Sequence, residues 1–187
     1  MLNETEIVQK YLRCRGITIP TPASIRACTV RRHGQSFPAM IAAVQRAEDR
    51  KIIAVQATMI RDDGTDKISI GIPRMTIGAL GTGAVRLAAA TDVVGLAEGV
   101  ETGLSAMQLF QIPVWCALGG TRMHRVAIPE SVRDLIVFAD NDATGRRYAE
   151  RTAHEHREAG RRVEIRTPRE VKDWNDLLCR RTAEAAA

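Results

Sequence analysis

The sequence predicts an α/β fold in which about four mainly parallel strands are flanked by helices and preceded by a small α+β lobe. After residue 90, apolar runs of strand length alternate with helical segments, a pattern typical of right-handed βαβ units. Before residue 90, apolar runs separated by turn signals predict a β-rich lobe with one or two helices. The length of 187 residues suits one core or two small lobes that share an interface.

The first half begins with a predicted helix from about Glu4 to Arg13. Asn3 precedes it as a possible N-cap, and Gly16 follows its end. The next segment, ITIPTPAS, contains two prolines and indicates extended or turn structure.

Two apolar runs follow, PAMIAAVQ and KIIAVQATMI, joined by the polar AEDR. The second run leads into RDDGTDK, whose Asp-Gly pair is a hairpin signal, and then into ISIGI, where we expect the returning strand. The glycine-rich MTIGALGTGAVRLAAA reads as a loop-rich connection that closes the lobe at residue 90.

The second half contains four predicted strands, DVVGLAEG, PVWCALGG, DLIVFAD and RRVEIRTP. Predicted helices over 101–111 and 143–159 and a short closing helix in DWNDLLCRR lie between and after these strands. We therefore expect a basic α+β lobe over 1–90, an α/β domain over 91–180 and a frayed tail over 181–187.

Composition excludes several classes of protein. No apolar stretch approaches the roughly 18–20 residues that span a bilayer, and the N-terminus lacks a secretory signal. The four cysteines are scattered without a CxxC pair, which argues against a zinc module or a disulfide framework. We expect a cytoplasmic protein that has no contact with membranes.

Positive charge is concentrated in the first half. Residues 1–90 hold 13 Lys and Arg against 7 Asp and Glu, whereas residues 91–187 hold 14 against 15. Arginine supplies most of these cations and suits bidentate contacts with phosphate. A basic lobe beside a more acidic domain favours a nucleic-acid or nucleotide partner, although a bias toward Arg codons would produce the same composition.

Three acidic motifs follow predicted strands of the second half. They are EGVET at 98–102, DND at 140–142 and KDWND at 172–176. Carboxyl ends of parallel strands meet at one edge of a sheet, so the three motifs should converge there. Carboxylates that gather in this way repel one another unless a cation neutralises them, and Mg²⁺ or Mn²⁺ prefers such oxygen ligands.

Each motif also has a purely structural interpretation. Glu98 could simply end a strand before a glycine turn. Asp140 and Asp142 could cap the helix over 143–159, with Asn141 as a spacer between them. Asp173 and Asp176 could be an N-cap and its partner on the last helix. The shared edge of all three motifs favours the functional interpretation.

The three motifs, taken in order, resemble those of the Toprim domain, a Rossmann-like domain shared by bacterial-type primases, topoisomerases and some nucleases. EGVET, ADNDATG and KDWND are most similar to the Toprim-containing primases of plasmids and phages, which act in DNA replication. The resemblance covers about residues 91–180 strongly. It extends more loosely to PAMIA and to the segment from IPRMTIG to GAVRL.

The resemblance implies roles for individual acids. Glu98 corresponds to a metal ligand or general acid/base, and Asp140 and Asp142 to a metal-binding pair; these three are the predicted catalytic residues. Asp173 resembles a later acid that helps to hold a second metal. Lesser candidates are Glu101, Asn175 and Asp176. Glu101 is included because the family often has Asp where this chain has Thr102, and Glu101 could equally cap its helix.

Basic residues form the other part of the predicted site. Lys67, Arg74 and Arg86 lie in the segment that resembles the template or nucleotide-phosphate surface of primases. Arg146 and Lys172 adjoin the acidic motifs, although an exposed arginine on a solvated helix face is an ordinary feature. The implied partners are single-stranded DNA and NTPs.

The resemblance implies a metal-dependent phosphoryl-transfer core that synthesises primers on single-stranded DNA. Two alternatives remain open from the sequence. One is a Toprim metal nuclease that cleaves phosphodiesters. The other is a non-catalytic nucleic-acid-binding or partner subunit that keeps a Mg²⁺-binding acidic edge. Primases of this kind usually carry a zinc module, and this sequence offers none. Three explanations stay open from the sequence: a fragment, a subunit completed in trans by a partner such as a helicase or a separate zinc-binding subunit, and a protein that no longer initiates primers.

Overall fold

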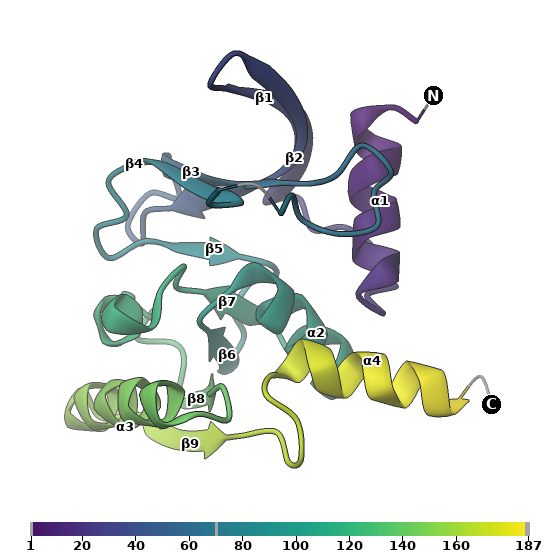
Figure 1. The fold of residues 1–187 in the computed structure, drawn as a ribbon. Coiled ribbons are helices and arrows are strands. Elements are labelled where there is room, and N and C mark those ends of the chain that lie inside the picture. Colours follow the sequence, from purple (N-terminus) through teal and green to yellow (C-terminus); the bar gives the residue numbers. More distant parts are fainter. Residues whose placement is uncertain (1, 70, 186–187) are drawn as a thin grey trace.

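The computed structural model describes residues 2–69 and 71–185, which form one nine-stranded sheet with helices on its faces (Figure 1). The strands run in the order β4-β3-β2-β5-β7-β6-β8-β9, and β1 also pairs with β2. In chain order the elements are α1 (Glu4–Cys14), β1 (Ile25–Arg32), β2 (Gln35–Gln45), β3 (Ile52–Met59), β4 (Arg74–Gly78), β5 (Ala84–Arg86), β6 (Val93–Ala97), α2 (Val100–Phe110), β7 (Val114–Cys116), the 3₁₀ helix η1 (Gly120–Arg125), β8 (Asp134–Phe138), α3 (Ala143–Glu158), β9 (Arg162–Arg166) and α4 (Trp174–Ala185).

The N-terminal lobe consists of α1 and the antiparallel strands β1–β4. α1 begins with a capping box in which the Asn3 side chain accepts from the Glu6 amide and the Glu6 carboxylate accepts from the Asn3 amide. Its apolar face, which includes the fully buried Tyr11, packs toward β1 and β2. The predicted helix and its cap are confirmed.

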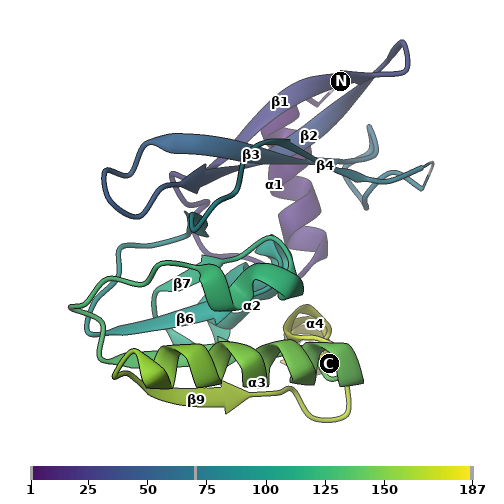
Figure 2. The same cartoon turned by 90° about the vertical axis from the view of Figure 1, so that its left-hand side faces the viewer.

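The parallel half consists of β6–β9 with the remaining helices, and it confirms the predicted α/β domain. β7, β6, β8 and β9 are mutually parallel neighbours. Buried residues of α2 and α4 share one hydrophobic cluster, and those of η1 and α3 share another, so the helices cover the sheet from both faces. In Figure 2 the N-terminal lobe stands above this half, and α3 lies in front of its sheet.

β5 joins the two parts of the sheet. It pairs antiparallel with β2 through Val85 and Ala84, and antiparallel with β7 through Val85 and Arg86. The sheet therefore continues from the N-terminal lobe into the parallel half through a strand of only three residues.

The interpretation of residues 75–90 as a loop-rich connection is wrong, because this segment contributes to β4 and forms β5. Its glycines mark close backbone approaches. A Cβ on Gly78 would lie 2.5 Å from the Ile53 carbonyl oxygen, and one on Gly83 would lie 2.8 Å from that of Gln45. The described residues of the expected strand at 68–72 form no strand; an isolated bridge between Ile60 and Lys67 lies just before them, and Ile70 lies outside the described residues.

The C-terminal end also differs from the expectation. α4 continues to Ala185, so the residues expected to fray from 181 onward are helical up to that point. Residues 186–187 of the expected tail lie outside the described residues. No helix in the described part of the chain is both long and apolar enough to cross a membrane.

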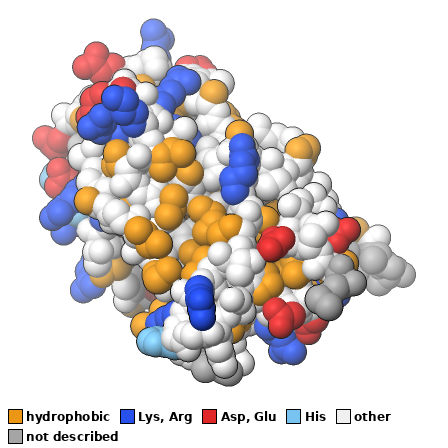
Figure 3. Space-filling model, turned by 90° about the horizontal axis from the view of Figure 1, so that it is seen from above, with side chains coloured by type: hydrophobic (Ala, Val, Ile, Leu, Met, Phe, Trp, Pro, Cys, Tyr) orange, Lys and Arg blue, Asp and Glu red, His pale blue; other side chains and the backbone are white. Residues whose placement is uncertain are grey.

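The positive charge of the N-terminal lobe is not gathered on its upper face. Seen from above, that face shows hydrophobic side chains at its centre, with Lys and Arg side chains at separate places around them (Figure 3). Several of the lobe's arginines are paired with acids of the same lobe, among them Arg15 with Asp66 and Arg46 with Asp49. The charge of the lobe as a whole therefore does not show which basic residues lie near the site; their individual contacts do.

Candidate active site

The acidic motifs meet at the carboxyl edge of the parallel strands, as predicted. Ala97 at the end of β6 is in register with Phe138 at the end of β8. Glu98 follows Ala97 directly, and Asp140 lies two residues beyond Phe138. The two carboxylates therefore extend from adjacent strands, and their charges influence each other.

Asp140 is the least compensated acid of this edge. Its Oδ1 is buried and has no hydrogen-bond partner among the described residues. Burial first, and then the charges of Glu98, Asp173 and Asp142, raise the pKa of Asp140 to about 6, while Lys172 acts in the opposite direction. The structure thus places four carboxylates close enough to repel one another, with Lys172 nearby.

Asp142 and Asp173 also cap helices. The Asp142 Oδ1 accepts from the Gly145 amide at 2.7 Å at the start of α3. The Asp173 Oδ1 accepts from the amides of Asn175 and Asp176, each at 2.9 Å, at the start of α4. The structural interpretation of these two acids is therefore correct, and it leaves Oδ2 of each carboxylate for another role.

Two glycines allow the elements of this edge to approach closely. A Cβ on Gly120 would lie 2.2 Å from the Tyr148 ring and 2.7 Å from Glu98 Oε2. A Cβ on Gly145 would lie 2.6 Å from the Asp140 carbonyl oxygen, so α3 can begin directly against the end of β8. Gly145 is required for this contact, because any side chain there would meet the Asp140 backbone.

Asn141 is more than a spacer. Its amide donates to the Lys172 carbonyl at 2.7 Å, and its Nδ2 donates to the Val171 carbonyl at 3.1 Å. Its Oδ1 accepts from Arg146 Nη1 at 2.9 Å. Asn141 thus holds the KDWND segment against the end of β8 and orients Arg146, a function that the sequence pattern did not reveal.

The edge fits a divalent cation in chemistry. Its side chains are carboxylates, and one buried oxygen of Asp140 lacks a donor. Across residues 2–69 and 71–185, no three His, Cys, Asp or Glu side chains are gathered closely enough to complete a metal site in their present rotamers. Asp142 and Asp173 are directed toward helix amides, so metal binding would require their free oxygens to turn inward.

Glu101 has a different environment from these acids. Its Oε1 accepts from Tyr11 Oη at 2.9 Å, from Lys67 Nζ at 3.2 Å and from Arg74 Nη2 at 2.9 Å. Burial alone would raise the pKa of Glu101, but the charges of Arg74 and Lys67 outweigh it and lower the pKa to about 2. Glu101 is therefore a buried ion-pair acceptor that connects α2 to the N-terminal lobe.

Tyr11 is a residue of this cluster that sequence reasoning missed. Burial and the neighbouring Glu101 raise the pKa of its phenol, so the hydroxyl remains protonated and donates. The helical spacing of Ile7, Val8, Tyr11 and Leu12 marks a buried face, but nothing in that spacing identifies a partner 90 residues away.

The remaining candidates are distributed over four places. The Asn175 amide is buried and donates to the Arg15 carbonyl and to Ser105 Oγ, which gives it a packing role, whereas Asp176 is exposed. Lys67 and Arg74 lie at the Glu101 cluster. Lys172 and Arg146 border the acidic edge. Arg86 is on β5, with its guanidinium 4.3 Å from the centroid of the Trp115 ring.

Comparisons with known proteins agree with this architecture. Residues 93–184 match the family model of the Toprim domain, and residues 2–87 match a model described as a domain of unknown function (DUF7146). The comparison with curated protein sequences found no match.

Solved primase structures have the same fold. The primase fragment of the bacteriophage T7 primase-helicase superimposes with a TM-score of 0.57 at 16% identity, over 95% of this chain and 67% of that one. The DnaG catalytic core superimposes with a TM-score of 0.63 at 12% identity, over 98% and 73%. For the Aquifex aeolicus primase the values are 0.62 and 12%, over 99% of this chain and 60% of that one.

Residues 93–184 are therefore a Toprim domain. The architecture of the chain is that of the catalytic cores of bacterial and phage DNA primases, which confirms the family resemblance read from the three motifs.

Proposed function

We propose that this protein is a primase-type nucleotidyltransferase that extends primers on single-stranded DNA with NTPs. The observation that carries the proposal is the unpaired, buried Oδ1 of Asp140 among three further carboxylates at the carboxyl edge. Such an arrangement stores repulsion that a divalent cation relieves. The Toprim match and the primase folds support the same reaction class.

Glu98, Asp140, Asp142 and Asp173 would hold Mg²⁺ or Mn²⁺. These carboxylates would supply oxygen ligands, and the chemistry supplied by a cation held there would be neutralisation of the charge that develops in phosphoryl transfer. Glu98 is also the proposed acid/base group, because it ends β6 beside Asp140 and extends toward Gly120. Lys172 and Arg146 border these acids and would orient the phosphates of the incoming nucleotide.

Lys67 and Arg74 would contact the template from the N-terminal lobe. Both donate to the same oxygen of Glu101, so two positive charges share one negative charge. Arg74 remains 42% exposed at its side chain, which leaves it accessible to a phosphate. We also propose that a helicase or zinc-binding partner supplies part of the template recognition. The T7 relative is a fragment of a primase-helicase protein, which favours the helicase.

The test is a primer-synthesis assay with single-stranded DNA, labelled NTPs and Mg²⁺ or Mn²⁺. Asp140→Asn should reduce product at least 100-fold, because the amide cannot replace a carboxylate ligand. Asp134→Asn is the matched control. Asp134 lies at the other end of the same strand and pairs with Arg162 at the surface, so its loss should leave synthesis within about twofold.

The assay also separates the alternatives. Asp140-dependent shortening of the DNA would identify a nuclease instead. If DNA binding is intact but neither extension nor shortening occurs with either metal, also when a helicase is added, both enzymatic functions are rejected in favour of a binding subunit.

A further inference from the structure

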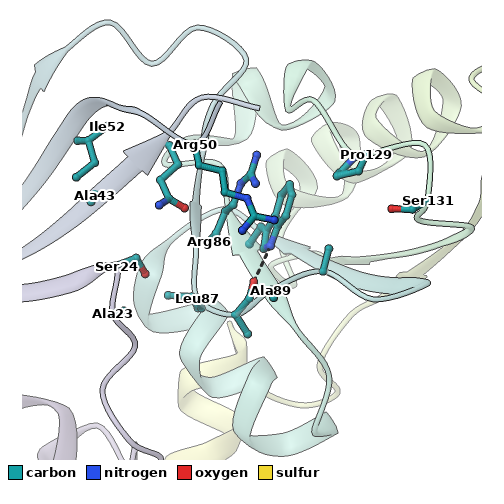
Figure 4. A pocket seen from close by; sticks show the side chains of 14 residues that line it. Ala23, Ser24, Ala43, Arg50, Ile52, Arg86, Leu87, Ala89, Pro129 and Ser131 are labelled. Carbon is teal, nitrogen blue, oxygen red and sulfur yellow. Dashed lines mark hydrogen bonds between the residues drawn. The ribbon is translucent and has the colours of Figure 1, made fainter. Parts of the chain in front are cut away.

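A second site lies at the opposite end of the parallel strands (Figure 4). It is a pocket of about 410 Å³, here called the amino-edge pocket. Residues 87–90, which lead into β6, line it together with Pro129 and Ser131, which lead into β8. Gln45 at the end of β2 and Arg50 in the β2–β3 turn close it from the N-terminal lobe. The carboxylates of the candidate active site follow the same strands, so the two sites are on different edges.

The amino-edge pocket contains two arginines. The Arg86 guanidinium is held by the Trp115 ring and by donation from its Nη2 to the carbonyl oxygens of Arg46 at 3.3 Å and Ala47 at 3.2 Å. Arg50 lies near enough that its charge, after burial, lowers the pKa of Arg86. Among the described residues that line the pocket, none is Asp or Glu.

A second pocket also contains arginines, and two of its four are paired with acids. It measures about 620 Å³ and lies between β9 and α4. Arg166 in that pocket pairs with Glu164, and Arg180 pairs with Glu170. Within the part of the chain that the structure describes, Arg50 and Arg86 form no such ion pair. Among the described residues, Glu48 is near enough for its charge to act on Arg86 against that of Arg50, so the positive charge of the pocket is only partly compensated.

Two further donors in the pocket wall lack acceptors. Ser24 is 8% exposed, and its Oγ has no hydrogen-bond partner among the described residues. The Nε of Arg86 is also buried and also has no hydrogen-bond partner among the described residues. Leaving such groups unsatisfied is unfavourable, so the wall suits a ligand with several acceptor oxygens.

The other walls are apolar. Ala43, Ile52, Leu87 and Ala89 line them, and Ile52 is 63% exposed. Pockets of roughly 300–1,000 Å³ hold small ligands, and this combination of an arginine pair with an apolar wall matches a phosphate attached to a less polar body. A nucleotide has both parts.

We propose that the amino-edge pocket binds a nucleotide, with its phosphate at Arg50 and Arg86 and its base or sugar against the apolar wall. This site is independent of the acidic motifs. It also spans the narrow joint of the sheet, because Gln45, Arg86 and Trp115 come from β2, β5 and β7. A bound nucleotide would therefore contact the N-terminal lobe and the Toprim domain at the same time.

The test is isothermal titration of ATP into the full chain in EDTA, which removes divalent cations from the acidic edge. The wild type should bind ATP under these conditions, and adenosine should not bind measurably. Arg50→Asn should weaken ATP binding at least tenfold. Asn tolerates the φ of 60° at this turn, so the backbone is preserved. The matched control is Arg31→Asn, which removes an exposed arginine of β1 and should bind as the wild type does.

Three results would overturn the proposal. The first is absence of ATP binding in EDTA. The second is ATP binding that Arg50→Asn leaves unchanged. The third is binding of a short oligothymidylate that depends on Arg50 when ATP does not bind, which would assign the pocket to a nucleic-acid strand. None of these results depends on whether the protein synthesises primers.

Discussion

Glu98 and Glu101 belong to the same EGVET motif, yet the two carboxylates have opposite electrostatic surroundings. Around Glu101, one tyrosine and two cations supply three donors to a single buried oxygen, and the pKa of Glu101 falls to about 2. Around Glu98, the neighbouring Asp140 has an unpaired buried oxygen, and burial among acids raises its pKa to about 6. Side chains of the protein neutralise the Glu101 carboxylate. The carboxylates around Asp140 need a bound cation for the same purpose.

This contrast separates a carboxylate that stabilises the fold from carboxylates that are available for chemistry. Exposure contributes to the distinction, since Glu101 is buried, whereas Glu98, Asp140 and Asp173 are half-buried and Asp142 is exposed. The donors that the chain supplies also make the distinction, because Glu101 Oε1 accepts from three side chains and Asp140 Oδ1 accepts from none that the structure describes. Four predictions test it, from the largest expected effect to the smallest.

Glu101→Ala should lower the free energy of unfolding by about 3–5 kcal/mol, because it leaves Lys67 and Arg74 without their buried acceptor. Urea denaturation followed by circular dichroism measures this change. Asp140→Asn is the comparison: it should leave stability unchanged or increase it, because it removes a charge from a repulsive cluster. A loss above about 2 kcal/mol in Asp140→Asn would contradict the contrast.

Stability should depend on Glu101 at acidic pH. The pKa of Glu101 is about 2 in the folded protein, below its ordinary value of 4.5, so the unfolded chain takes up a proton first as the pH falls. About 3 kcal/mol of stability should be present above pH 4.5 and lost progressively toward pH 2. Urea titrations at several pH values should show this loss in the wild type, and a smaller one in Glu101→Gln.

Mg²⁺ should stabilise the folded protein only through binding at the acidic edge. At about pH 7.5 and 100 times its dissociation constant, the ion should add about 2.7 kcal/mol, which raises the melting temperature by several degrees. Asp140→Asn should abolish this increase, whereas Glu101→Gln should keep it even though its starting temperature is lower. Scanning calorimetry with and without EDTA measures both. An equal response in Asp140→Asn and the wild type would place the ion elsewhere.

Asp173→Ala should cost about 1 kcal/mol of stability, because the amides of Asn175 and Asp176 lose their acceptor. Asp173→Asn should restore most of that stability, since Asn is also a good N-cap, but it should not restore primer synthesis. Thermal melts and the synthesis assay together separate the cap from the proposed metal ligand. Full activity in Asp173→Asn would leave Asp173 with the capping role only.

Much of the Toprim half could be predicted from the sequence, because its strands are continuous apolar runs that end in polar motifs. DLIVFAD and EGVET show both their strands and their shared edge without any knowledge of packing. The N-terminal lobe was harder to predict. β4 is largely exposed and β5 has three residues, so neither shows the periodicity that identifies a strand.

The site shows the same division. Chain order and strand ends predicted the convergence of Glu98, Asp140, Asp142 and Asp173, since that follows from topology alone. The donors around Glu101 come from α1, β4 and the bridge at Lys67, up to 90 residues away, and only the folded chain brings them together. The packing role of Asn175 was hidden for the same reason.

β5 has a mechanical consequence. The sheet is weakest at β5, a strand of three residues between β2 and β7. A force between the two halves of the sheet would deform it there first. Glu101 of α2 also connects the two halves, because its Oε1 accepts hydrogen bonds from Tyr11, Lys67 and Arg74 of the N-terminal lobe. A movement that separates the two halves must twist β5 and break the Glu101 contacts, and it must also break the hydrogen bond from Asn175 to Arg15 and part the hydrophobic cluster that α1 shares with α2 and α4.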